Sequence, residues 1–129
     1  MKLSRSELKQ LMKNKLMKAG LPEDQAETVS EILVWSDERG LHSHGSVRVE
    51  YYCERIAKGG WTLHPHYTYR QTGPCSAILD GDNVSGYVAA KMAMEKAIEM
   101  AKETGISVMG IKNIAHSGAL GYYTDCLLY

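Results

Sequence analysis

The 129-residue sequence lacks an excess of charge of either sign, because it carries 15 basic and 15 acidic side chains. It therefore has no broad electrostatic footprint for nucleic acid or for an anionic membrane. It also lacks an apolar run long enough to span a bilayer, and its first residues lead into an amphipathic helix rather than an apolar secretion signal. These absences disfavour nucleic-acid and membrane partners and predict a cytoplasmic location.

Cysteine pairs and glycine-rich motifs are missing as well. Cys53, Cys75 and Cys126 are an odd number with no CxxC or zinc-ribbon spacing, so we expect reduced thiols that pack as small apolar residues and no metal site. Neither GxGxxG nor a phosphate loop is present, which argues against the usual Rossmann dinucleotide site.

What the sequence does contain is a helical segment over residues 1–60. A capping-box signal, Ser4 with Glu7, opens a first helix that runs to Gly20. A second helix is predicted over residues 22–39, and a third from Gly45 through residue 58. The apolar positions at helical spacing predict a buried face in the first two helices: Leu8, Leu11, Met12, Leu16 and Ala19, then Ala26, Val29 and Leu33.

Residues 61–129 predict an α/β segment. Alternating residues 66–70 and the apolar run 75–79 predict two strands of a hairpin, with a turn at Gly73-Pro74. A helix over residues 85–104 and a strand over residues 106–111 follow, which gives a strand-helix-strand crossover. Another helix is expected to begin at Ala119. The chain as a whole is long enough for one domain with a core of its own.

The stretch His42-Ser43-His44-Gly45 is the first candidate site. If a helix begins at Gly45, its free N–H groups and dipole favour an anionic ligand there, and Arg48 adds a guanidinium that can grip a carboxylate. Tyr52 lies four residues beyond Arg48 on the same helix face. The ordinary alternative is that Ser43 caps the helix and Arg48 pairs with a surface carboxylate such as Glu50 or Glu54.

The second candidate site is His116-Ser117-Gly118, at the carboxyl end of the last predicted strand. Open α/β sheets usually bind ligands at this edge. If His116 stands at the entrance of the next helix, the helix dipole disfavours the charged imidazolium and leaves a ring that can accept a proton. The alternative is a histidine that only caps the helix.

The last residues, 126–129, fall within an apolar helical pattern that has no terminal glycine or charged last turn. Because an unfinished apolar helix needs a partner surface, we expect the chain to be the N-terminal portion of a longer protein.

The stretches SDERGLHSHGSVRVEYY and NIAHSGALGYY, supported by ERIAKGG, TGPCSAILDGDN and GYVAAKMAMEKAI, resemble the malate/L-lactate dehydrogenase-type family of NAD(P)-dependent 2-hydroxyacid oxidoreductases. The resemblance covers essentially the whole chain. It implies an α/β, non-Rossmann NAD-binding fold, NAD or NADP as cofactor, cofactor-binding residues mostly beyond residue 129, and a homodimer or higher homo-oligomer.

The resemblance also implies roles for individual residues. His116 matches a proton acceptor and His44 matches the proton donor of some relatives, while Ser43, Arg48 and Tyr52 match substrate-pocket positions. We expect Arg48 and His116 to face a common cleft. The substrate that the resemblance favours is ureidoglycolate, oxidised to oxalurate, with malate, L-lactate or a diketogulonate-type 2-keto acid as alternatives.

The sequence is also compatible with two other classes of function. The pairs His42/His44 and His64/His66 each place two imidazoles close together, as metal ligands require, although no further ligands at zinc-like spacing accompany them. Alternatively, the isolated 129-residue chain is a catalytically inactive, dimer-forming module that binds small carboxylates.

Overall fold

The computed structural model describes residues 2–128, and side chains for residues 2–125. The chain divides into two compact units at the boundary between residues 63 and 64, and each unit is described separately. None of the helices within residues 2–128 combines the length and the apolar character that crossing a bilayer requires.

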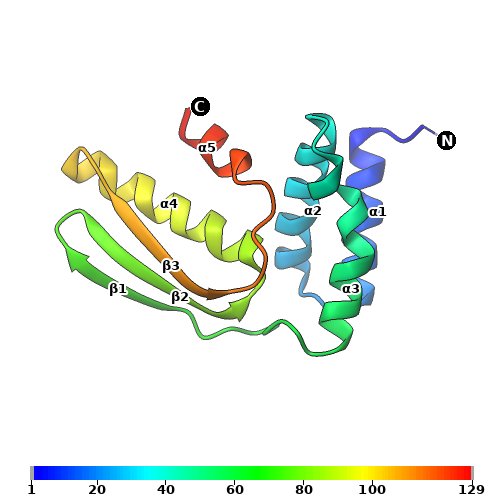
Figure 1. Cartoon of the computed structure of the whole chain (residues 1–129), viewed down its shortest axis with the longest axis horizontal. Coiled ribbons are helices and arrows are strands. Elements are labelled where there is room, and N and C mark those ends of the chain that lie inside the picture. The colour runs from blue at the N-terminus through cyan, green and yellow to red at the C-terminus, as the bar shows by residue number, and fades with distance from the viewer. Residues whose placement is uncertain (1, 129) are drawn as a thin grey trace. The chain divides into compact units, whose positions relative to one another are not determined.

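The first unit is helical (Figure 1). Its elements are α1 (Arg5–Lys18), α2 (Glu23–Glu38), the 3₁₀ turns η1 (His42–His44) and η2 (Ser46–Arg48), and α3 (Val49–Ala57). The capping box at Ser4 is confirmed, because its side chain and that of Glu7 each bond to the other's backbone N–H. Met12 and Leu16 are buried as predicted. The prediction that Leu11 belongs to the core is wrong, since it is 56% exposed.

The face between α1 and α2 combines an apolar core with a ladder of ion pairs. Ala26, Val29 and Leu33 are fully buried, as the helical spacing predicted. Along the edge, basic side chains of α1 alternate with carboxylates of α2 in the pairs Arg5–Glu31, Lys9–Glu27, Lys9–Glu31, Lys13–Glu23 and Lys13–Glu27. The polar faces of α1 and α2 thus contact each other as well as solvent.

The third helix begins later than the sequence predicted. Two 3₁₀ turns occupy residues 42–48, and the α-helix runs only from Val49 to Ala57. The expectation that His44 stands at the entrance of an α-helix opened by Gly45 is therefore wrong. Tighter 3₁₀ turns fit a short connection whose hydrogen bonds run from His44 N–H to Leu41 and from Gly45 N–H to His42.

The second unit is α/β, as predicted (Figure 1). Its elements are β1 (Thr68–Gly73), β2 (Ser76–Val84), α4 (Gly86–Thr104), β3 (Val108–Ile114) and α5 (Gly121–Leu128). In the order β1-β2-β3, the first pair is antiparallel and the second is parallel. The hairpin and the strand-helix-strand crossover are both confirmed. Helix α4 packs on one face of the sheet, with Leu79, Val84, Ala89 and Ala93 at the centre of the core.

The strands extend further than the sequence pattern indicated. β2 continues through the polar stretch 80–83, where Asp82 and Asn83 adopt positive φ and the register to β3 shifts. The Asp80 carboxylate stabilises this irregularity by accepting hydrogen bonds from the backbone N–H of Asp82 and the side-chain amide of Asn113. These bonds, with the Lys112 ammonium 3.1 Å away, hold the pKa of Asp80 below its usual range.

Candidate active site

The loop before α3 joins three of the predicted site residues. Ser43 Oγ lies 2.9 Å from His44 Nδ1, in a hydrogen bond whose donor depends on the histidine tautomer. Arg48 Nε donates a hydrogen bond to the backbone carbonyl of Ser43 at 2.7 Å. Ser43, His44 and Arg48 therefore form one hydrogen-bonded group. Ser43 does not cap α3, whose N-terminus has no side-chain cap.

The charge of Arg48 has no carboxylate partner among the residues whose side chains are described. Glu50 pairs with Lys15, and Glu54 lies 3.7 Å from Lys58. Neither carboxylate neutralises Arg48, so the ordinary ion-pair interpretation does not hold. Because Nε is bound to Ser43, the guanidinium plane is fixed and its two terminal NH₂ groups remain able to bind a carboxylate.

Tyr52 is buried in the first unit. Its ring centroid lies 5.2 Å from that of Trp61 and 5.7 Å from that of Tyr51. Only 1% of the residue is exposed. The aromatic contacts fix the ring at the turn of α3 that follows Arg48, and its proposed contact with substrate stays a prediction.

His116 belongs to the second unit and follows the end of β3. The expectation that it stands at the entrance of the next helix is wrong, because α5 begins only at Gly121. A different helix end lies beside it. A Cβ on Gly86, the first residue of α4, would overlap the carbonyl of Ala115 and lie 2.7 Å from that of His116. The positive end of the 19-residue α4 thus adjoins the backbone of His116.

The backbone on both sides of His116 is fixed by hydrogen bonds. The N–H of Ala115 donates to the carbonyl of Val84 at 2.9 Å, and the hydroxyl of Tyr123 donates to the carbonyl of Ser117 at 2.7 Å. The ring of Tyr87 meets that of His116 edge to face, with centroids 6.2 Å apart. His116 itself is exposed, so an accessible imidazole stands on an ordered segment.

Asp37, Gly86 and Tyr87 are the residues at these two positions that the sequence interpretation missed. Asp37 accepts a hydrogen bond from the backbone N–H of Ser46, and the other two contact the His116 segment. A signal existed for Asp37, because a carboxylate in the last turn of a helix opposes the helix dipole. Gly86 and Tyr87 carried none, since they fit the helical pattern of α4.

Within residues 2–125, the histidine pairs lack the further ligands of a metal site, and Cys53 lacks the surroundings of an activated thiol. Among the described residues, no three His, Cys, Asp or Glu side chains are grouped so as to hold a metal ion. Cys53 and Cys75 are free thiols, while the side chain of Cys126 lies outside the described residues. Burial raises the pKa of the Cys53 thiol despite the nearby Lys15 ammonium, which makes it a weak nucleophile.

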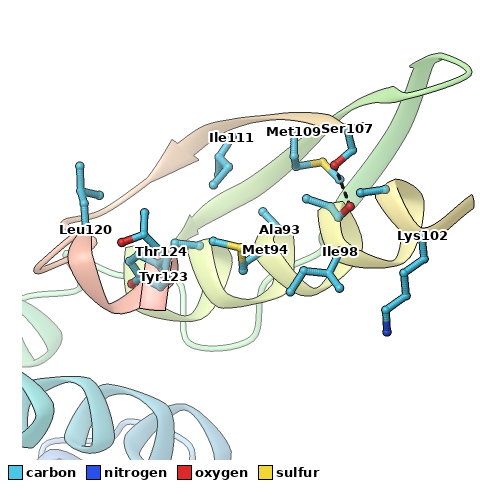
Figure 2. A pocket seen from close by; sticks show the side chains of 13 residues that line it. Ala93, Met94, Ile98, Lys102, Ser107, Met109, Ile111, Leu120, Tyr123 and Thr124 are labelled. Atoms are coloured by element: carbon cyan, nitrogen blue, oxygen red, sulfur yellow. Dashed lines mark hydrogen bonds between the residues drawn. The ribbon is translucent and has the colours of Figure 1, made fainter. Parts of the chain in front are cut away.

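An apolar hollow of about 740 Å³ lies between α4, β3 and α5 (Figure 2). Met94, Ile98, Met109 and Leu120 supply much of its lining. Its hydroxyl groups are already engaged: Ser107 donates to the carbonyl of Ala97 at 2.7 Å, and Tyr123 donates to that of Ser117. None of the predicted site residues lines this hollow, and its apolar walls do not suit a small carboxylate.

The chain thus combines two loops that carry histidines, an arginine with no carboxylate partner among the described residues, and a mixed sheet. The chain belongs to the malate/L-lactate dehydrogenase family, whose model matches residues 3–128. The expected family is confirmed.

Individual members of the family differ in how similar they are to this chain. The chain is 56% identical over 125 residues to the NAD(+)-dependent ureidoglycolate dehydrogenase of Escherichia coli strain K12, a match that covers 97% of this chain and 36% of that protein. It is 39% identical over 122 residues to the malate dehydrogenase of Pyrococcus abyssi, covering 95% of this chain and 34% of that protein. The chain thus spans about a third of the length of these curated relatives.

Solved structures confirm the fold. The malate dehydrogenase of Pyrococcus horikoshii OT3 matches with a TM-score of 0.93 and 36% identity, over 98% of this chain and 36% of that one. The sulfolactate dehydrogenase of Methanocaldococcus jannaschii matches with a TM-score of 0.91 and 34% identity, over 98% and 37% of the two chains. The predicted α/β, non-Rossmann class is therefore that of the family.

Proposed function

We propose that this chain is the N-terminal portion of a longer NAD(P)-dependent oxidoreductase that acts on the CH–OH group of a small 2-hydroxy acid. Ureidoglycolate, oxidised to oxalurate, is the substrate we propose first, on the strength of 56% identity to a ureidoglycolate dehydrogenase. Malate, L-lactate and diketogulonate-type 2-keto acids are the alternatives within the family. We place the protein in the cytoplasm as a homodimer or higher homo-oligomer.

The observation that carries the proposal is the unpaired guanidinium of Arg48. Arg48 is only partly exposed, its Nε is fixed by Ser43, and no described carboxylate neutralises its charge. A substrate carboxylate can occupy the two terminal NH₂ groups in a bidentate arrangement. Every substrate named above carries such a group.

In the proposed reaction His116 accepts the proton of the substrate hydroxyl. Its exposed ring, the ordered segment around it and the adjacent positive end of α4 all support this role. Ser43, His44 and Tyr52 orient the substrate that Arg48 holds. The reverse assignment, with His44 as the proton donor for reduction of a keto acid, is the alternative that the family suggests.

Oxidation requires a hydride acceptor, and NAD, or NADP, supplies that chemistry when bound. The N-terminus of α4 offers no cradle for its pyrophosphate. In a usual strand-helix-strand unit the phosphates bind at the helix N-terminus, but the backbone of Ala115 and His116 covers the N-terminus of α4. We therefore assign this chain the substrate side of the site and expect the dinucleotide-binding residues mostly beyond residue 129.

The test is a spectrophotometric assay of NAD and NADP reduction by the complete protein with ureidoglycolate, malate and L-lactate as substrates. We expect turnover with NAD and the highest kcat/KM for ureidoglycolate. The 129-residue chain is assayed beside it and should be inactive. No turnover of any 2-hydroxy acid by the complete protein would refute the proposal.

A second candidate is favoured by one observation, the exposed apolar surface of the second unit. Ile106, Val108 and Leu120 are each more than 60% exposed, at 65%, 63% and 68%. The isolated chain would then be a self-associating module that binds carboxylates without turnover. Sedimentation of the 129-residue chain should show a dimer in that case, and a monomer at all concentrations would exclude it.

A further inference from the structure

Asp37 occupies a position that its own helix does not explain. It lies in the last turn of α2, where the helix dipole disfavours a carboxylate, and α2 has no basic residue in that turn to offset it. The neighbouring Glu38 is exposed and pairs with Arg5 at 3.1 Å. The side chain of Asp37, in contrast, is only 15% exposed. The contacts of the Asp37 side chain explain why a carboxylate stands there.

Both oxygens of Asp37 reach into the loop that carries the site residues. Oδ2 accepts a hydrogen bond from the backbone N–H of Ser46 at 2.7 Å, and Oδ1 lies 3.2 Å from Nδ1 of His42. His42 belongs to η1 and Ser46 belongs to η2. One carboxylate therefore fastens both 3₁₀ turns to the end of α2.

Gly45, between the two turns, is shaped to fit the same carboxylate. Its φ of −99° and ψ of −147° lie in the extended region, so the turn does not require glycine for a positive φ. A Cβ at this position would overlap the carboxyl group of Asp37. The glycine is therefore needed because Asp37 packs against its backbone.

We infer that Asp37 is a positioning residue that holds the loop of residues 42–48 in the geometry that binds the substrate carboxylate. Ser43 and His44 lie between its two contacts, and Arg48 is two residues beyond Ser46 and bonded back to Ser43. The inference rests on the proposed function for the identity of the ligand. Fixing the loop in advance removes the cost of ordering it when substrate binds.

The first experiment tests the geometry without turnover. In the 129-residue chain, we expect Asp37→Ala to accelerate amide hydrogen exchange at Ser46 by about 10-fold or more, as loss of a hydrogen bond to a charged group implies. Asp37→Asn keeps an acceptor and should restore most of the protection. Glu38→Ala, which removes the neighbouring exposed carboxylate, is the control and should leave Ser46 unchanged. Unchanged exchange in Asp37→Ala would overturn the inference.

The second experiment is a double-mutant cycle with Gly45, read out as KM and kcat of the complete protein. Gly45→Ala should raise KM about 10-fold or more when Asp37 is present, yet have little further effect in Asp37→Ala, because the clashing carboxylate is gone. Asp37→Ala alone should raise KM by a similar factor while kcat changes less. Additive effects in the cycle, or an unchanged KM for Asp37→Ala, would overturn the inference.

The two proposals fail in different ways. If the unaltered protein turns over no 2-hydroxy acid, the proposed function fails, and binding of oxalate to the 129-residue chain then replaces KM as the measure of carboxylate binding. Weaker oxalate binding by Asp37→Ala than by Glu38→Ala would still support the inference. If the unaltered protein is active and Arg48→Ala raises KM while Asp37→Ala does not, the inference alone is wrong.

Discussion

Arg48 Nε donates a hydrogen bond to the backbone carbonyl of Ser43, five residues earlier, at 2.7 Å. This bond joins the candidate carboxylate-binding group to the residue whose hydroxyl contacts His44. A guanidinium held in this way has a fixed plane, which is the condition for bidentate recognition of a carboxylate.

The first prediction concerns Arg48. In the complete protein, Arg48→Ala should raise KM for the 2-hydroxy acid by about 10- to 100-fold with a smaller change in kcat, because a charged pair of hydrogen bonds is lost. Arg48→Lys should recover only part of the affinity, since an ammonium cannot form the bidentate pair. Arg55→Ala, on the exposed end of α3, is the matched control. Steady-state kinetics measure all three, and a normal KM for Arg48→Ala would contradict the assignment.

The second prediction concerns His116. His116→Ala should lower kcat by about 10²- to 10⁴-fold, the usual contribution of a positioned acid–base group. His66→Ala, another exposed histidine of the same unit, is the control. Near-normal turnover by the His116 variant would refute this role and favour His44 as the acid–base residue.

The third prediction concerns the packing of Gly86 against the His116 segment. Gly86→Ala should lower the free energy of unfolding by about 1–3 kcal/mol, because the start of α4 and the backbone of Ala115 and His116 must move apart to admit a methyl group. It should also reduce kcat, since the displaced segment carries His116. In Gly110→Ala, the control, the new Cβ would meet Ile78 Cγ1 at an ordinary 3.4 Å. Denaturant unfolding measures the free energy of unfolding of both variants, and steady-state kinetics measure their kcat.

The fourth prediction is an acid-sensitive contribution from the α1–α2 ion pairs. Burial alone raises the pKa of Glu31, but hydrogen bonds from Lys9 and Arg5 outweigh it, and hydrogen bonds from Lys9 and Lys13 lower the pKa of Glu27. Folded-state values below the ordinary 4.5 mean that the stabilisation is present above that pH and is lost as the pH falls through and below it.

Glu31→Gln measures this contribution. It should lower Tm by a few degrees at pH 7, for a loss of about 1 kcal/mol or less, and have a smaller effect at pH 3, which lies below the ordinary pKa of 4.5 and therefore favours the protonated carboxyl. High salt should reduce the difference at pH 7. Glu103→Gln, an exposed carboxylate near the end of α4, should be neutral at both values. Equal effects of Glu31→Gln at pH 7 and pH 3 would contradict the prediction.

The order of the elements followed from local chemistry. The capping box at Ser4 and the glycine at residue 105, which adopts a positive φ after α4, mark helix ends because they satisfy or release backbone groups at those positions. The element boundaries were less accurate where polar residues continue a strand. β2 runs through residues 80–83 because Asn113 of β3, far along the sequence, donates to the Asp80 carboxylate, which also accepts the backbone N–H of Asp82.

The sequence by itself determined the family, the helical and α/β segments and the residue types of the two histidine loops, since motifs and hydrophobic periodicity are properties of neighbouring residues. Only the tertiary structure decided that a carboxylate at the end of α2 fastens the loop of His44 and Arg48, and that the helix end beside His116 is the start of α4. Both relationships join residues that are separated along the chain, and they depend on a close approach of side chain to backbone that no local pattern encodes.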